Sequence, residues 1–178
     1  MLLLFACTAS PVDSPEETSP DSDGLALDDS SPPVARADLV INEFMAWNTD
    51  SLRLEDDSSP DWIELYNRGE EAVDLAGWWL SDSSEEPYRH ALPPDLGPIE
   101  PGGFVLLYVD ASEAAGHVDF QLSKDGDEIL LSAPSGVAED WIAFEAQAQD
   151  IAAARSPDGE ETWIFVPGGT PGASNGQR

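Results

Sequence analysis

The sequence predicts an all-β fold, a β-sandwich of about nine short strands. From Leu39 onward the apolar residues recur mostly at every second position or in short runs, which is the spacing of half-buried and fully buried strands. Gly, Pro, Asp and Ser interrupt these runs at short intervals, as turns between strands do. All six tryptophans, all three tyrosines and five of the six phenylalanines lie in this part of the chain, and they suffice for one hydrophobic core.

Each expected strand is an apolar run bounded by turn residues. The first is LVINEFMA, and the second is DWIELYN, whose successive side chains point to opposite faces of a strand. AVDLAGWWLS and YRHAL follow, and GFVLLYV comes after a Pro-Gly-Gly turn. HVDFQL and DEILLSA flank the turn KDG, AEDWIAF follows them, and TWIFV comes after the turn PDG. In chain order the expected strands are residues 39–46, 61–67, 72–81, 88–92, 103–109, 117–122, 127–133, 138–144 and 162–166.

One segment has two interpretations. Residues 139–153 (EDWIAFEAQAQDIAA) are rich in good helix formers and could make a helix of about three turns. Their apolar spacing fits a helix imperfectly, so we expect a strand followed by a loop.

The first 38 residues differ from the rest in composition. Residues 8–38 hold five prolines and eight acids against one base, Arg36, and such a stretch buries too little apolar surface to offset its ordering entropy. We therefore expect a short signal-like segment at 1–7, a disordered acidic tether at 8–38 and one folded domain at 39–176.

The net charge of −29 restricts the classes of partner. A field of this sign repels DNA, RNA and anionic membrane surfaces, so no nucleic acid is expected to bind. No apolar run approaches the roughly 20 residues of a membrane-spanning helix.

The only cysteine, Cys7, follows a short apolar run. The sequence Leu-Phe-Ala-Cys resembles the lipobox of bacterial lipoproteins, in which the cysteine carries the lipid; Leu4 and Ala6 match that pattern and Phe5 is bulkier than usual. Five apolar residues follow Met1, fewer than the roughly 7–15 of a signal peptide, so the segment is a truncated form of that signal. The resemblance implies a lipid on Cys7 and an outer-membrane or cell-surface location. The alternative is an ordinary N-terminus on a secreted or cytosolic protein.

Seven motifs, in this order and spacing, carry a second resemblance, which covers residues 39–176. They are INEFMA, EDDSSPDWIELYN, VDLAGWWLSD, IEPGGFVLLYVD, DFQLSKDGDEILL, ARSPDG and TPGASN. Together they resemble the bacterial lamin-tail domain. The resemblance implies an immunoglobulin-like β-sandwich on an exported or surface protein, and no activity of a neighbouring domain transfers to this chain.

Candidate binding and catalytic residues were sought among the aromatic side chains and the histidines. Exposed tryptophans could stack on sugars, but most tryptophans of a small sandwich pack in its core, and of the adjacent pair Trp78-Trp79 only one can be core. His90 and His117 each stand alone in a strand without a nucleophile motif, so no catalytic residue is expected.

Two carboxylates, Glu43 and Glu64, fall inside apolar strand patterns. A partly buried carboxylate needs a hydrogen-bond donor, and Arg155 is one of few bases available. We therefore expect Arg155 to form a structural ion pair with Glu43 or Glu64.

Acidic side chains gather in two expected loops, Glu55, Asp56, Asp57 and Asp61 in one and Asp125, Asp127 and Glu128 in the other. Calcium prefers such oxygen ligands, so a weak calcium site centred on the first loop is one interpretation. Neither loop matches the EF-hand pattern, and we favour solvated charge and no cofactor.

These features predict a non-enzymatic module that is lipid-anchored at the bacterial cell envelope. Its expected role is the binding or display of an envelope protein or glycan. The alternative is an accessory recognition unit of an exported hydrolase, or a small hydrolase itself.

Overall fold

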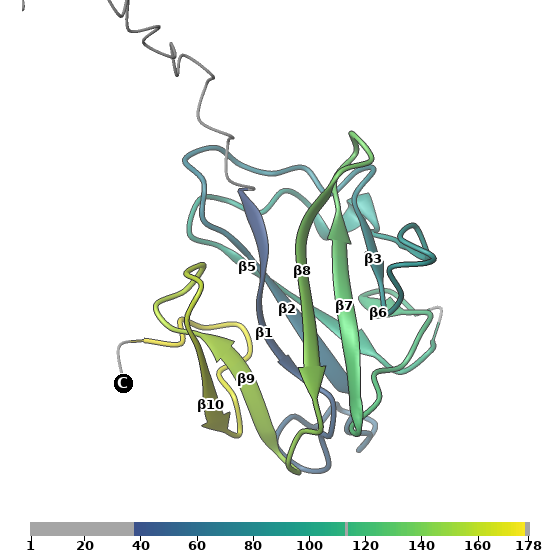
Figure 1. Cartoon of the computed structure of the whole chain (residues 1–178), viewed down its shortest axis with the longest axis vertical. Coiled ribbons are helices and arrows are strands. Elements are labelled where there is room, and N and C mark those ends of the chain that lie inside the picture. The colour runs from purple at the N-terminus through teal and green to yellow at the C-terminus, as the bar shows by residue number, and fades with distance from the viewer. Residues whose placement is uncertain (1–37, 113, 177–178) are drawn as a thin grey trace, which may run out of the picture. The chain divides into compact units, whose positions relative to one another are not determined.

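The computed structural model describes residues 38–112 and 114–176, and in these residues the chain is all-β (Figure 1). One short 3₁₀ turn, Pro94–Leu96, is the sole helical element of the described part, and no helix there is long and apolar enough to span a membrane. The strands are β1 (Leu39–Met45), β2 (Asp61–Asn67), β3 (Trp79–Ser81), β4 (His90–Ala91), β5 (Phe104–Val109), β6 (His117–Val118), β7 (Gly126–Ser132), β8 (Ala138–Glu145), β9 (Ile151–Arg155) and β10 (Trp163–Pro167).

The strands form two sheets that pack face to face. One sheet has six strands in the order β10-β9-β1-β2-β5-β6, and the other has four in the order β4-β3-β7-β8. All strand pairs are antiparallel except β5 with β6. This arrangement confirms the expected immunoglobulin-like β-sandwich.

Period-two alternation decides which side chains enter the core. In β1, Phe44 belongs to the main core between the sheets, whereas its neighbour Met45 packs in a smaller cluster with Trp62 and Ala152. The two clusters lie on opposite faces of the six-stranded sheet, because successive side chains of a strand point to opposite faces. A register shift in β1 between Ile41 and Glu43 places Glu43 opposite Glu64 of β2.

Three expected strands are much shorter than the sequence predicted, and of residues 88–92 only His90–Ala91 form a strand. Of residues 72–81 only Trp79–Ser81 pair as a strand, because Gly77 has a φ of 82° and Trp78 donates a hydrogen bond back to the carbonyl of Leu75, which makes a turn. Of residues 117–122 only His117–Val118 form a strand, and Gln121 adds an isolated bridge to Asp110.

The segment with two interpretations contains a strand, a short loop at residues 146–150 and the start of a second strand. Residues 138–145 form β8, as expected, but residues 151–155 form an additional strand, β9. Strand β9 pairs with β1 on one side and with β10 on the other. The helix alternative was therefore wrong. The expected strand and the loop after it are present, but the loop ends at residue 150, where a strand that the sequence did not predict begins.

The six-stranded sheet extends beyond the edge of the four-stranded sheet. Strand β8, the edge of the smaller sheet, lies against β1, where the backbone amide of Ile41 donates to a carboxylate oxygen of Asp140 at 2.8 Å. The β9–β10 hairpin continues the larger sheet to the side of β8 (Figure 1). Part of its inner face therefore has no strand above it among the described residues.

Candidate functional site

A groove lies between β8 and the β9–β10 hairpin, with a volume of about 360 Å³. We call it the β8 groove; its walls are Ile142 to Gln147 of β8 and the loop after it, Phe44 of β1, Ala153 of β9, and Trp163 and Phe165 of β10. It is the inner face of the larger sheet at the place where the smaller sheet does not cover it.

Four aromatic side chains line the groove, Phe44, Phe144, Trp163 and Phe165. The ring of Phe44 lies 4.7 Å from that of Phe144 and 5.7 Å from that of Trp163, measured between centroids. Phe165 is 76% exposed, the most exposed of the large apolar side chains in the described part of the chain. A phenylalanine this exposed, next to other apolar walls, is typical of an interaction surface.

One polar side chain of the groove has an unused donor. Gln147 is buried, with 7% of its surface exposed, and its Oε1 accepts a hydrogen bond of 2.7 Å from the backbone amide of Ala46. Its Nε2 is buried and has no hydrogen-bond partner in the described structure. A buried amide nitrogen without an acceptor costs free energy unless a ligand or water supplies one.

At the other end of β8, Arg155 ties the two sheets together. Its Nη2 contacts both carboxylate oxygens of Asp140 at 3.0 and 3.1 Å, and its Nε donates to the carbonyl of Ile41 at 2.7 Å. The guanidinium also lies over the ring of Trp163, 4.7 Å from its centroid. The sequence predicted an ion pair of Arg155 with Glu43 or Glu64, but the structure pairs Arg155 with Asp140. Glu43 lies opposite Ala154, the neighbour of Arg155, so the two side chains point to opposite faces of the larger sheet. Glu43 and its cross-strand partner Glu64 contact the segment after β10 instead.

Glu43 and Glu64 are fully buried and hold the segment after β10. The carboxylate of Glu43 accepts hydrogen bonds from the backbone and hydroxyl of Thr170, at 2.9–3.1 Å. The carboxylate of Glu64 accepts from the backbone amide of Gly172 at 2.5 Å and from Asn42 Nδ2 at 3.2 Å. Burial raises the pKa of Glu64 to about 7, against the opposing effect of these hydrogen bonds. Both acids have hydrogen-bond donors, most of them in the segment after β10 and one, Asn42, in β1.

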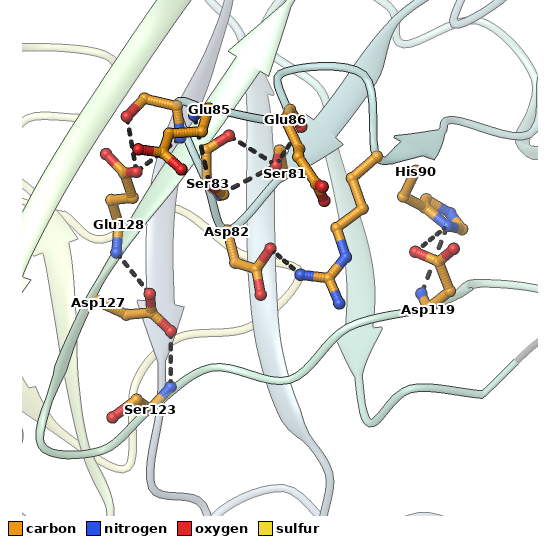
Figure 2. Close-up of polar contacts among 12 residues, drawn as sticks. Ser81, Asp82, Ser83, Glu85, Glu86, His90, Asp119, Ser123, Asp127 and Glu128 are labelled. Carbon is orange, nitrogen blue, oxygen red and sulfur yellow. Dashed lines mark hydrogen bonds and ion pairs between the residues drawn. The ribbon is translucent and has the colours of Figure 1, made fainter.

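Residues 82–89 form a polar loop between β3 and β4 that contacts β7 through Glu128 (Figure 2). Glu128 of β7 accepts from the backbone and hydroxyl of Ser84 and from Trp141 Nε1, at 2.6–2.9 Å, and these bonds lower its pKa. Ser81 donates to the carbonyls of Ser83 and Glu86. Figure 2 shows Glu128 of β7 beside the loop and the contacts among Ser81, Ser83 and Glu86, which hold the loop in place.

The tryptophans divide between core and surface. Trp62 is fully buried and Trp78 packs in the main core, whereas Trp79 is half-buried with its ring beside that of Tyr88. Only one member of the Trp78-Trp79 pair is core, as the sequence predicted. Trp141 is 54% exposed, with its Nε1 bonded to Glu128.

Both histidines line one cavity of about 410 Å³, which sequence reasoning did not predict. His90 Nδ1 lies 3.2 Å from Asp119 Oδ1, and His117 Nδ1 lies 2.9 Å from Asp110 Oδ2. They reach the cavity from β4 of one sheet and β6 of the other, so no local motif could have joined them.

The four acids of the first acidic loop do not converge on one point. Asp56 accepts from the backbone and hydroxyl of Ser58, Asp57 lies 3.6 Å from Arg53, and Asp61 accepts from the backbone amide of Asn48. Burial raises the pKa of Asp61 to about 6. Among the described residues there is no group of three or more His, Cys, Asp or Glu side chains placed to hold a metal, and Cys7 lies outside the described residues.

Comparison with protein families gives one match, the Lamin Tail Domain, over residues 32–146. No curated protein and no solved structure matches the chain. The matched residues end just after β8, so β9, β10 and the C-terminal segment lie beyond the match. Because the match spans more than half of the chain and the two packed sheets form an immunoglobulin-like sandwich, the chain belongs to the lamin tail domain family, a family of non-catalytic β-sandwich domains.

Proposed function

We propose that this protein is a non-enzymatic module of the bacterial cell envelope that binds a partner protein in the β8 groove. The observation that carries the proposal is the groove itself, where Phe165 is 76% exposed beside Trp163 and Phe144. Apolar clefts with a few directed polar groups are the usual form of a binding site, and Gln147 supplies such a group. The family supports a binding or structural role and no catalytic one.

A protein ligand fits the molecule better than a glycan. In the described part of the chain, the exposed aromatic side chains outside the groove are Trp141 and Tyr88. The polar atom of each already has a partner, Glu128 Oε2 for Trp141 and the carbonyl of Gly136 for Tyr88. Sugar recognition needs free polar groups beside the aromatic face, because every hydroxyl of the sugar must be satisfied. The β8 groove offers apolar area, which suits a polypeptide side chain.

The location at the envelope rests on the N-terminal sequence. Leu4, Ala6 and Cys7 resemble a lipobox, and the acidic residues 8–38 that follow would hold the domain away from a membrane surface. Mass spectrometry of the protein isolated from cells tests this part. A diacylglyceryl group on Cys7 with the preceding residues removed supports the anchor, and an intact Met1 with a free thiol contradicts it.

Selection from a random peptide library displayed on phage tests the binding function. The full chain is immobilised, and the enriched peptides are then tested on a Phe165→Asp variant and on a Val137→Asp variant, which changes another exposed apolar side chain outside the groove. We expect enriched peptides that lose binding to Phe165→Asp and retain it with Val137→Asp. No enrichment, or equal binding to both variants, contradicts the proposed function.

The proposed lack of enzymatic activity has its own test. The purified chain is assayed with esterase, phosphatase, nuclease and glycosidase substrates. Turnover that disappears in His90→Ala or His117→Ala, the two residues that share the second cavity, would show that the protein is a hydrolase.

A further inference from the structure

The sandwich has room for one more strand, next to β8. The larger sheet continues past β8 into β9 and β10, and the uncovered part of its inner face carries Ala153, Trp163 and Phe165. Neighbouring strands lie about 4.8 Å apart, so a strand added to the edge of β8 would lie over these side chains. Such an addition is a common way for a sheet to bind an extended peptide.

The edge of β8 is suited to accept that strand. Strand β8 pairs with β7 on one side and is the last strand of its sheet among the described residues. The backbone amide of Trp141 points away from β7, since it donates to Asp140 Oδ1 at 2.9 Å. Alternation along an antiparallel strand then places the N–H and C=O groups of Ala143 and Glu145 on the same free edge.

Gln147 supplies a second, independent indication of a ligand. It lies just beyond the end of β8, is more than nine-tenths buried, and lines the groove with an Nε2 that has no partner in the described structure. An amide nitrogen has two donors and needs a carbonyl or a similar acceptor. A backbone carbonyl of an added strand would provide one.

Charge indicates the composition of the added strand. The residues that line the groove include Glu145 and no Lys, Arg or His, and the whole chain has a net charge of −29. On the solvent side of β8 the side chains of Trp141 and Glu145 are exposed, and both attract a cation on a neighbouring strand. Two occupants from this protein itself are disfavoured because they carry negative charge, like the groove. They are residues 8–38, with eight acids and one base, and a second copy of the whole chain.

We propose that the occupant of the β8 groove is an extended segment of a different protein in which apolar residues alternate with Lys or Arg. This inference rests on the proposed function and names its ligand class. The apolar side chains contact Phe44, Phe144, Trp163 and Phe165, the basic side chains meet Trp141 and Glu145, and the backbone pairs with the edge of β8.

Binding of synthetic peptides to the full chain tests the inference by fluorescence anisotropy. The probe is a labelled peptide KVKFKVK; the comparison peptides are EVEFEVE, SVSFSVS and KKKKVFV, the last of which has the same composition without alternation. We expect KVKFKVK to bind at least about tenfold more tightly than each of the others, and to weaken as sodium chloride is added.

Three variants locate the binding. Phe165→Ser removes an exposed groove ring, Ala143→Pro removes an edge N–H, and Tyr88→Ser removes a half-exposed ring outside the groove as the matched control. Each must keep the wild-type melting temperature. We expect about tenfold weaker binding of KVKFKVK to the first two and no change in the control.

The outcomes separate the two proposals. If SVSFSVS binds as tightly as KVKFKVK and loses affinity in Phe165→Ser, the groove binds polypeptides but the basic ligand class is wrong. If KVKFKVK fails to bind, or binds Phe165→Ser as tightly as the wild type, the inference is overturned, while the selection from the random library still decides the proposed function.

Discussion

Buried charge in this domain is concentrated on a few residues. Arg155 is only 7% exposed, and its guanidinium contacts other strands and loops: Asp140 in β8, the carbonyl of Ile41 in β1, that of Glu160 before β10 and the ring of Trp163 in β10. A buried ion pair is weak evidence for stability compared with an apolar pair, but removing one partner leaves an uncompensated charge. Removing Arg155 is therefore expected to lower the free energy of unfolding more than removing any exposed base does.

The Arg155–Asp140 pair gives the first prediction. Arg155→Ala and Asp140→Ala each lower the free energy of unfolding by about 3 kcal/mol, because each leaves the other charge buried without its partner. In the double variant the loss is smaller than the sum of the two. Urea unfolding of the four proteins measures this. Arg53→Ala, which removes a half-exposed base, serves as the control, and additive losses contradict the pairing.

Glu64 gives a prediction of pH dependence. Burial raises its folded-state pKa from 4.5 to about 7, so between these values the folded state binds more protons than the unfolded state. The contribution of Glu64 to stability therefore falls as pH rises through this window, by an amount on the order of 3 kcal/mol, and is constant above it. The contribution of Asp61 to stability also falls as pH rises, because its folded-state pKa is raised from 3.8 to about 6.

The measurement compares wild type with Glu64→Gln. The difference in free energy of unfolding between the two proteins should shift in favour of the variant from pH 4.5 to pH 7. Glu100→Gln, an exposed change, should follow the wild type throughout. A constant difference between wild type and Glu64→Gln across this window would show that Glu64 titrates equally in both states.

At the scale of elements, the segment after β10 covers the outer face of the larger sheet. Glu43 and Glu64 hold Thr170 and Gly172, and Asn175 Nδ2 donates to the carbonyl of Arg155 at 2.8 Å. Gly169 lies so close to Trp62 that a Cβ there would stand 2.7 Å from the indole. The segment is therefore a packed part of the domain.

Two neighbouring glycines test that packing. Gly168 and Gly169 have similar positive φ angles, 79° and 69°, but a Cβ on Gly168 would have nothing within 4 Å. Gly168→Ala should cost about 1 kcal/mol through backbone strain alone, and Gly169→Ala should cost about 2 kcal/mol more because the indole must move. Thermal unfolding measures both. Equal losses would mean that the segment does not press on Trp62.

The sequence predicted some elements and missed others for physical reasons. LVINEFM and DWIELYN were recognisable because their apolar residues alternate or run together between turn residues. IAAAR was not, since alanines carry no strand preference, and this strand exists through its pairing with β1 and β10. The β8 groove was equally unpredictable, because its walls come from four strands whose adjacency depends on the topology.

At the scale of the whole molecule, the net charge of −29 opposes compaction. Sodium chloride is therefore expected to raise the melting temperature by screening, and calcium chloride to raise it no more at the same ionic strength. Glu55, Asp56, Asp57 and Asp61 are the residues on which a calcium site would depend. A calcium-specific rise that disappears in Asp56→Asn/Asp57→Asn would contradict this prediction.

In the proposed binding mode the four-stranded sheet gains a strand at the β8 edge when the ligand binds. Amide hydrogen exchange of the full chain, followed by NMR with and without KVKFKVK, detects this strand at single residues. We expect slower exchange for the amides of Ala143 and Glu145, and unchanged exchange for His90 at the opposite edge of the same sheet. With the peptide bound, unchanged exchange at Ala143 and Glu145, or new protection at β4 instead, would contradict it.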